Sequence, residues 1–225
     1  SNKVQEYSEA DIKYLAESGY NYLRINMSFT TFGAPDYPTD ENYINVNELE
    51  DLDELIGWCM EYGLHATVNM MAVPKRHDGN AWNELSYWAE SAGDTAETPY
   101  TEEEWKNIKD CFTMLSKRYE DIPIEYLSFE LINEGYAYDL EKQMSNWKTV
   151  ISAIREITPE RILIISVDNH EETALVEAFA KEGVAISYHS YNPRNFVYFQ
   201  NDWYEDSSGD TSVPAPQWPY VDENG

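Results

Sequence analysis

The sequence has few basic residues, almost no cysteine and no long apolar run. Lys and Arg total 15 against 42 Asp and Glu, which gives a formal net charge of −27 at pH 7. A field of that sign repels polyanions, so we expect neither nucleic acid nor an anionic membrane surface as a partner. Because no stretch of about 20 apolar residues is present, we expect no transmembrane helix.

Other absences narrow the class of protein further. The two cysteines, Cys59 and Cys111, fall in helical patterns, which argues against a disulfide framework or a cysteine-rich zinc site. No GxGxxG or GxxxxGK[ST] motif follows an apolar strand, so a nucleotide-binding sheet loses its main support. The first residues, 1–3, lack the apolar core of a signal peptide. Because the sequence has neither a nucleotide-binding motif nor a cysteine cluster, we expect no bound cofactor.

Helical and strand-like patterns alternate five times along the chain. Capping pairs such as Thr101 and Glu104 open helices, and glycines such as Gly63 end them. The strands are nearly continuous apolar runs, which is typical of a parallel sheet covered by helices. Helices are expected at 8–19, 47–63, from 101, around 144–154 and at 171–181, and strands at 20–29, 64–71, 124–132, 162–167 and 184–191.

A (β/α) barrel and an open doubly wound sheet both fit this alternation, and the missing nucleotide motifs favour the barrel. A closed TIM (β/α)8 barrel needs eight strands and about 250 residues. We therefore expect one domain over 1–225 that supplies about five βα units of an incomplete barrel, with 192–225 as a long irregular loop. Since unpaired strand edges aggregate, the remainder of the barrel should come from further sequence or from another chain.

The run 126–134 predicts a buried strand that delivers Asn133 and Glu134 at its carboxyl end. In parallel α/β barrels the reacting groups lie at that end of the strands, so Glu134 is a catalytic candidate. Aromatic residues are also abundant, with 18 Tyr and 7 Trp, and their flat rings suit sugar faces. Those in loop-like stretches are Trp82, Tyr87, Trp88, Tyr136, Tyr138, Trp203, Tyr204, Trp218 and Tyr220.

The ends of several strands resemble those of glycoside hydrolase family 5, the cellulase and mannanase barrels. Segment 129–134, Phe-Glu-Leu-Ile-Asn-Glu, resembles the family's fourth strand, which implies that Asn133 contacts the sugar 2-hydroxyl and Glu134 is the general acid/base. Segment 19–25 resembles the second strand, which implies that Arg24 holds the nucleophilic carboxylate. Segment 188–193 resembles the sixth strand, in which His189 would bond the acid/base and Tyr191 the nucleophile. We also expect these two side chains to share a strand face.

Two features depart from the family pattern. The third strand has Asn69-Met70-Met71 where the family commonly has Asp-Leu-His. The family's nucleophile is a Glu at the end of a seventh strand, which we expect beyond residue 225. Glu130 lies four residues before Glu134, about 13 Å away along an extended strand, too far for a retaining carboxylate pair.

The resemblance implies a retaining, endo-acting hydrolase of β-1,4-linked plant polysaccharide, with cellulose or β-glucan as the leading substrate and with secretion as its location. Asn69, Trp82, Tyr136, Trp203 and Trp218 are the expected substrate-binding residues. One alternative is a carbohydrate-binding pseudoenzyme or inactive fragment. Another is a metal-dependent barrel enzyme, but no metal site is expected, since no single element carries ligand-like spacing among His65, His77, His170 and His189.

Overall fold

The structure is a computed structural model that describes residues 7–28, 46–72, 100–134, 139–167, 173–191 and 193–198. The chain divides into two compact units, 1–188 and 189–225. The prediction of one domain over 1–225 stays a prediction. The second unit contains a four-residue helix, α7 (Arg194–Val197), inside the segment that was expected to be an irregular loop.

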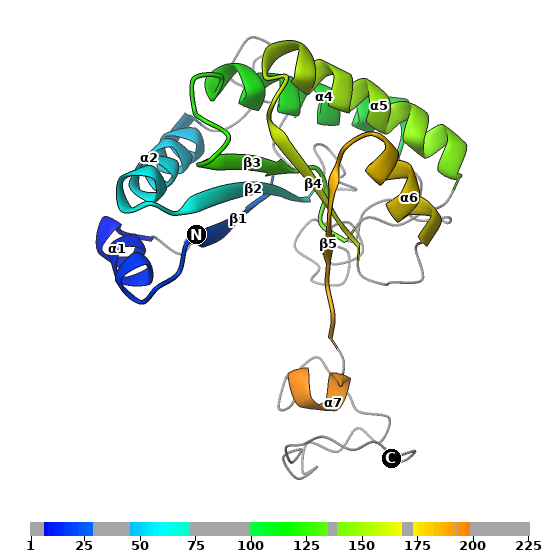
Figure 1. Cartoon of the computed structure of the whole chain (residues 1–225). Helices are drawn as coiled ribbons and strands as arrows, with labels where there is room; N and C mark the ends of the chain where they lie inside the picture. The colour runs from blue at the N-terminus through cyan, green and yellow to red at the C-terminus, as the bar shows by residue number, and fades with distance from the viewer. Residues whose placement is uncertain are drawn as a thin grey trace. The chain divides into compact units, whose positions relative to one another are not determined.

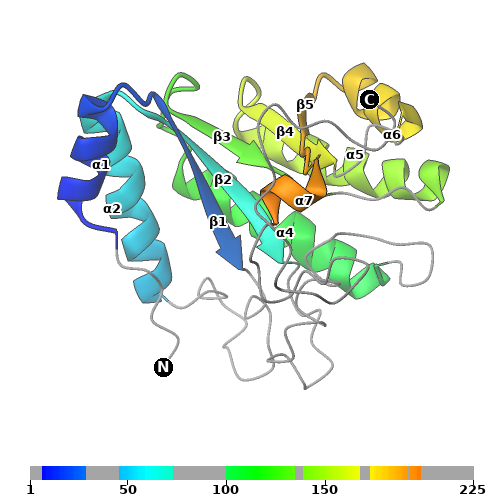
Figure 2. The same cartoon turned by 90° about the horizontal axis from the view of Figure 1, so that it is seen from below.

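A five-stranded parallel sheet forms the first unit, and its strand order follows the chain. In a doubly wound sheet the order reverses at a switch point, so this uninterrupted order is that of a barrel wall. The strands run in the same direction (Figure 2). They are β1 (Tyr22–Ser28), β2 (His65–Ala72), β3 (Leu127–Glu130), β4 (Ile162–Val167) and β5 (Ala185–Tyr188).

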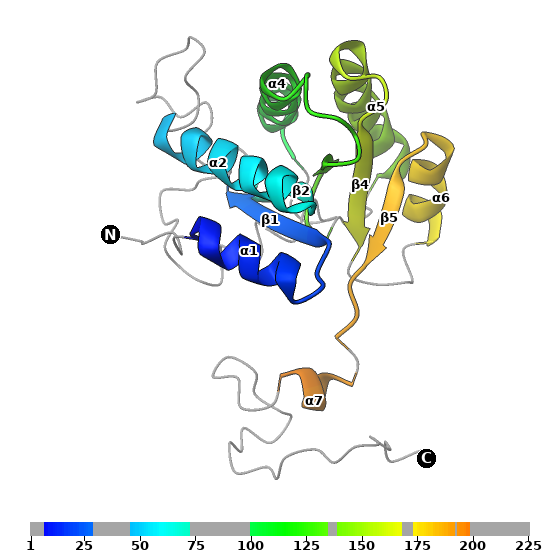
Figure 3. The same cartoon turned by 60° about the vertical axis from the view of Figure 1, so that its left-hand side comes forward.

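Helices cover the outer side of this sheet (Figures 1 and 3). Neighbouring helices pack in sequence, α1 on α2, α4 on α5 and α5 on α6. The apolar core lies between helices and strands, where Trp147 contacts Trp105 edge-on with ring centroids 4.9 Å apart. The helices are α1 (Glu9–Glu17), α2 (Val46–Tyr62), α4 (Glu102–Arg118), α5 (Leu140–Ile157) and α6 (Thr173–Lys181).

The inner face of β1, β2 and β3 is polar. Side chains two residues apart share a strand face, and paired residues on neighbouring strands line up across it. The inner layers therefore consist of Arg24 with Thr67 and Ser128, and of Asn26 with Asn69 and Glu130. Aliphatic side chains fill the interior of most (β/α)8 barrels, so the polar layers here indicate a region with a binding or catalytic role.

Several predicted boundaries are corrected. The strand expected at 124–132 is β3, Leu127–Glu130, because a turn in which the Tyr126 N–H bonds the Pro123 carbonyl at 3.1 Å precedes it. The strand expected at 184–191 ends at Tyr188. Helix α2 begins at Val46, so Asn47 lies inside the helix and is not its N-cap.

Cys59 and Cys111 lie in α2 and α4, as predicted, and both thiols are free and buried. Burial raises the pKa of Cys59 to about 11 and the pKa of Cys111 well above its usual value. Both residues therefore pack as small neutral side chains.

Within the part of the chain that the structure describes, no helix is long and apolar enough to cross a membrane.

The capping box predicted for α4 is confirmed. The Thr101 N–H donates to Glu104 Oε2 at 2.6 Å, and the Glu104 N–H donates to Thr101 Oγ1 at 3.2 Å. We expect Thr101→Ala to lower the free energy of unfolding by about 1 kcal/mol, measured by urea denaturation. Thr113→Ala inside the same helix is the control and should be near neutral, because alanine has the higher helix propensity. Equal losses in both variants would contradict a capping role.

Candidate functional site

Glu134 lies in a turn just beyond β3, at the carboxyl end of the sheet. Its φ is +49°, in the left-handed region that residues other than glycine rarely adopt. Its N–H donates to Ser166 Oγ of β4 at 2.8 Å, and that hydroxyl donates to the Ile132 carbonyl at 3.2 Å. The neighbouring strand thus holds the backbone that carries the candidate acid/base.

Arg24 of β1 and Glu130 of β3 form a two-pronged ion pair. Arg24 Nε donates to Glu130 Oε2 at 2.6 Å, and Nη2 donates to Oε1 at 2.7 Å. The Glu130 side chain is only 1% exposed, whereas that of Arg24 is 26% exposed. This planar arrangement fixes the guanidinium on the inner face of the sheet.

The remaining donors of Arg24 extend the network to three strands. Nη2 also donates to Asn133 Oδ1 at 2.8 Å, and Nη1 donates to Asn26 Oδ1 at 3.0 Å. Asn26 Oδ1 in turn accepts from Asn69 Nδ2 of β2 at 2.9 Å. Because Asn133 Oδ1 is bound to Arg24, the amide is oriented with its NH2 group directed away from the guanidinium.

The electrostatics of this network favour a permanently charged arginine. Burial lowers the pKa of Arg24, but the hydrogen bonds and charge of Glu130 outweigh it and leave that pKa raised. The charge of Glu134 acts in the same direction. Arg24 therefore interacts with the carboxylates of both Glu130 and Glu134, and it contributes a positive charge to the site.

The structure brings together three of the predicted catalytic residues, Arg24, Asn133 and Glu134. It pairs Arg24 with Glu130, a partner that the sequence prediction did not propose, and the expected contact between Arg24 and a nucleophile stays a prediction. Asn69 lies in the same network but is fully buried. Its direct contact with substrate also stays a prediction.

The other predicted site residues do not belong to the described part of the first unit. His189 and Tyr191 belong to the second unit and follow the end of β5, so the expectation that they share a strand face is wrong. Their rings meet edge-on with centroids 6.4 Å apart, and Tyr191 stacks on Tyr198 at 5.4 Å. Four predicted substrate-binding residues lie outside the described ranges, namely Trp82, Tyr136, Trp203 and Trp218.

Three residues of the site were missed from the sequence: Asn26, Glu130 and Ser166. A signal existed for Glu130, because a carboxylate in an otherwise apolar buried strand requires a cation, and Arg24 was already placed near a strand end. Asn26 shares a strand face with Arg24, which its spacing of two residues could have indicated. Ser166 carried only the weak signal of a small polar residue in an apolar strand.

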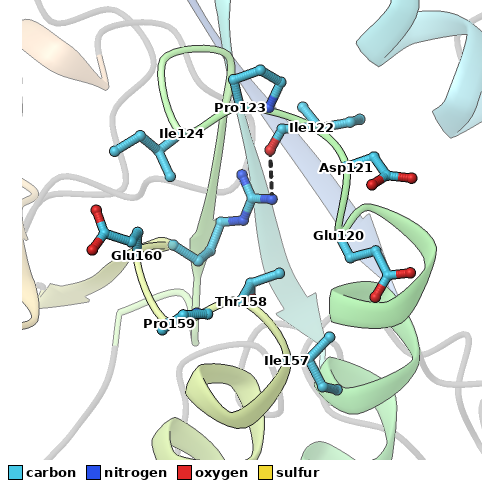
Figure 4. A pocket seen from close by; sticks show the side chains of 10 residues that line it. Glu120, Asp121, Ile122, Pro123, Ile124, Ile157, Thr158, Pro159 and Glu160 are labelled. Carbon is cyan, nitrogen blue, oxygen red and sulfur yellow. Dashed lines mark hydrogen bonds between the residues drawn. The ribbon is translucent and has the colours of Figure 1, made fainter.

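A separate hollow of about 250 Å³ lies at the opposite end of β3 and β4, between segments 120–124 and 157–161 (Figure 4). Arg161 on its wall donates to the carbonyls of Leu127, Tyr119 and Ile122 at 2.8 to 2.9 Å. These bonds join the loops that enter β3 and β4. Arg161 therefore has a structural role in tying the amino ends of the strands together.

Comparison with known proteins places the chain in a family. Residues 2–225 match the family described as cellulase, glycosyl hydrolase family 5. Endoglucanase C of Acetivibrio thermocellus is 26% identical over 206 residues, which cover 88% of this chain and 54% of that protein. A glucan 1,3-beta-glucosidase of Lachancea kluyveri is 24% identical, over 82% of this chain and 42% of its own length. The chain thus spans about half the length of the curated relatives that it matches.

Solved structures show the same fold at low identity. A crystal structure of a glycoside hydrolase superposes with a TM-score of 0.67 and 21% identity, over 94% of this chain and 61% of that one. A hyperthermophilic endo-beta-1,4-glucanase in complex with substrate gives a TM-score of 0.64 and 20% identity, over 88% and 57%. The five described strands therefore form part of the wall of a TIM (β/α)8 barrel, and the chain belongs to glycosyl hydrolase family 5.

Proposed function

We propose that the protein is a retaining, endo-acting glycoside hydrolase of β-1,4-linked plant polysaccharide, with cellulose or β-glucan as the main substrate. The observation that carries this proposal is the position of Glu134 at the carboxyl end of β3, with its backbone held by Ser166 and the Arg24–Asn133 pair beside it. Family membership supports hydrolysis of a glycosidic bond. Relatives named endoglucanase support β-glucan as the substrate class.

In this mechanism the protonated Glu134 donates its proton to the glycosidic oxygen as the bond to the anomeric carbon breaks. A second carboxylate attacks that carbon and forms a covalent glycosyl-enzyme. Glu134, now ionised, takes a proton from water, and the resulting hydroxide displaces the carboxylate and completes hydrolysis. We propose that this nucleophile is a Glu supplied from beyond residue 225, about 5 Å from Glu134.

Glu130 does not fit the nucleophile's role. Its side chain is almost fully buried, and both of its oxygens accept hydrogen bonds from Arg24. Its contribution is to hold Arg24, which in turn orients Asn133. The Asn133 NH2 group is then the natural donor to the sugar 2-hydroxyl, a hydrogen bond that strengthens in the transition state.

The remaining parts of the proposal concern substrate binding and location. Aromatic side chains would supply platforms for the substrate, since sugar rings stack on flat apolar faces. The proposed residues are Trp82, Tyr136, Trp203 and Trp218. His189 and Tyr191 would complete the polar contacts to the two carboxylates. We propose that the protein acts outside the cell, where plant polysaccharide is found.

The test is release of reducing ends from soluble cellulose, mixed β-glucan, mannan and xylan by the protein that includes the proposed nucleophile beyond residue 225. We expect the highest rate on soluble cellulose or mixed β-glucan, and the first product should keep the β-anomeric configuration when it is followed by proton NMR. Release of the α-anomer first would contradict a retaining mechanism. Oligosaccharide binding without any turnover would indicate a carbohydrate-binding protein in place of an enzyme. The absence of both binding and turnover would overturn the proposal.

A further inference from the structure

We propose that Ser166 is a positioning residue for Glu134, through which strand β4 sets the place of the acid/base. This inference rests on the proposed function of Glu134. Ser166 Oγ accepts a hydrogen bond from the backbone N–H of Glu134, and Ser166 is fully buried. It therefore acts on the carboxyl group through the turn that carries it and makes no contact with substrate itself.

The hydroxyl of Ser166 bridges two backbone groups on either side of Asn133. It accepts from the Glu134 N–H at 2.8 Å and donates to the Ile132 carbonyl at 3.2 Å. The last β3–β4 ladder pair joins Glu130 and Ile164, so Ser166 lies two residues further along β4, level with the point where the chain turns. One side chain thus continues the contact between the strands after the β-ladder has ended.

The turn needs such support because of its conformation. Glu134 is the one residue other than glycine with a positive φ in the described ranges, and side chains with a Cβ adopt that region at an energetic cost. Without the Ser166 hydroxyl, the Glu134 N–H would lose this hydrogen bond next to the buried Asn133. A residue here must accept and donate at once, which a hydroxyl does and a methyl group does not.

The position of Glu134 determines how fast it can donate a proton to the substrate. A general acid must lie within hydrogen-bond reach of the leaving oxygen, and an error of about 1 Å can lower a rate about 100-fold. Loss of the Ser166 hydroxyl should therefore lower the rate of proton donation and have a smaller effect on the affinity for substrate. The loss should be largest for substrates whose leaving group needs a proton.

The experiment compares Ser166→Ala, Ser166→Cys and Ser166→Thr in the active protein. We expect Ser166→Ala to lower kcat on soluble cellulose about 10- to 100-fold, with KM within about twofold and a displaced basic limb of the pH profile. Ser166→Cys preserves volume with a weaker bonding group and should lie between, which keeps the test open if Ser166→Ala fails to fold. Ser166→Thr retains the hydroxyl and should recover most of the rate. Ser116→Ala, at a buried serine of α4, is the matched control and should leave kcat unchanged.

A second readout needs no activity. Hydrogen exchange of the Glu134 amide, followed by NMR, should be at least about 10-fold faster in Ser166→Ala than in the wild type, with the helices unaffected. If the wild type does not hydrolyse glucan, the proposed function fails while this exchange test of the hydrogen bond still stands. Unchanged exchange would overturn the inference. Faster exchange with unchanged kcat and pH profile would also overturn it, since the turn would then not place Glu134.

Discussion

Glu134→Gln should abolish most hydrolysis of soluble cellulose, with kcat lowered about 10²- to 10⁴-fold. The substitution keeps size and hydrogen-bonding capacity but removes the proton that the leaving oxygen requires. KM should change little, because the aromatic platforms and Asn133 are untouched. Reducing-end release under saturating substrate measures the effect.

Glu125→Gln provides the matched control for that variant. Glu125 is exposed and precedes β3, at the opposite end of the strand from Glu134. The same chemical change there should leave kcat within about twofold of the wild type. A Glu134→Gln protein that retained wild-type turnover would remove Glu134 from the mechanism.

The second large effect concerns stability. Glu130→Gln should lower the free energy of unfolding by about 3 kcal/mol, because breaking a buried ion pair leaves the Arg24 guanidinium without its counter-charge. For a chain of this length, that corresponds to a fall in the melting temperature of about 6 to 12 °C. Thermal denaturation followed by circular dichroism measures it. The wild-type pair is buried on the Glu130 side, so the loss should persist at high salt.

Asp53→Asn tests whether burial is the reason. Arg118 also binds Asp53 through Nε and Nη2, but both side chains are more than one third exposed. Exposed pairs are worth at most about 1 kcal/mol, so this variant should melt close to the wild type. Similar losses in the two variants would contradict the view that the inner-face pair is the special one.

The helices and strands were largely predictable because their signals are local. The capping pair of Thr101 and Glu104 is confirmed by two hydrogen bonds between residues three apart. The strand at 162–167 is confirmed with the same bounds, since a continuous apolar run defined it. Such features depend on a few neighbouring residues, and sequence patterns report them directly.

The partners within the site were less predictable because they depend on register. Arg24 and Glu130 are 106 residues apart in the sequence. They meet because the pairing of β1, β2 and β3 places Asn26, Asn69 and Glu130 at the same level of the sheet. The left-handed turn at Glu134 was also missed, because nothing in the Asn-Glu dipeptide demands a positive φ. A strand over 124–132 was predicted, whereas the ladder ends at Glu130.

The most direct test of Glu134 as the proton donor is the first turnover of Glu134→Gln on two aryl β-cellobiosides, one with 2,4-dinitrophenol and one with phenol as leaving group. Dinitrophenolate leaves without a proton, so we expect a first-turnover rate close to the wild type for that substrate and a loss of about 10²-fold or more for the phenyl substrate. Equal losses on both substrates would contradict the assignment of Glu134 as the general acid.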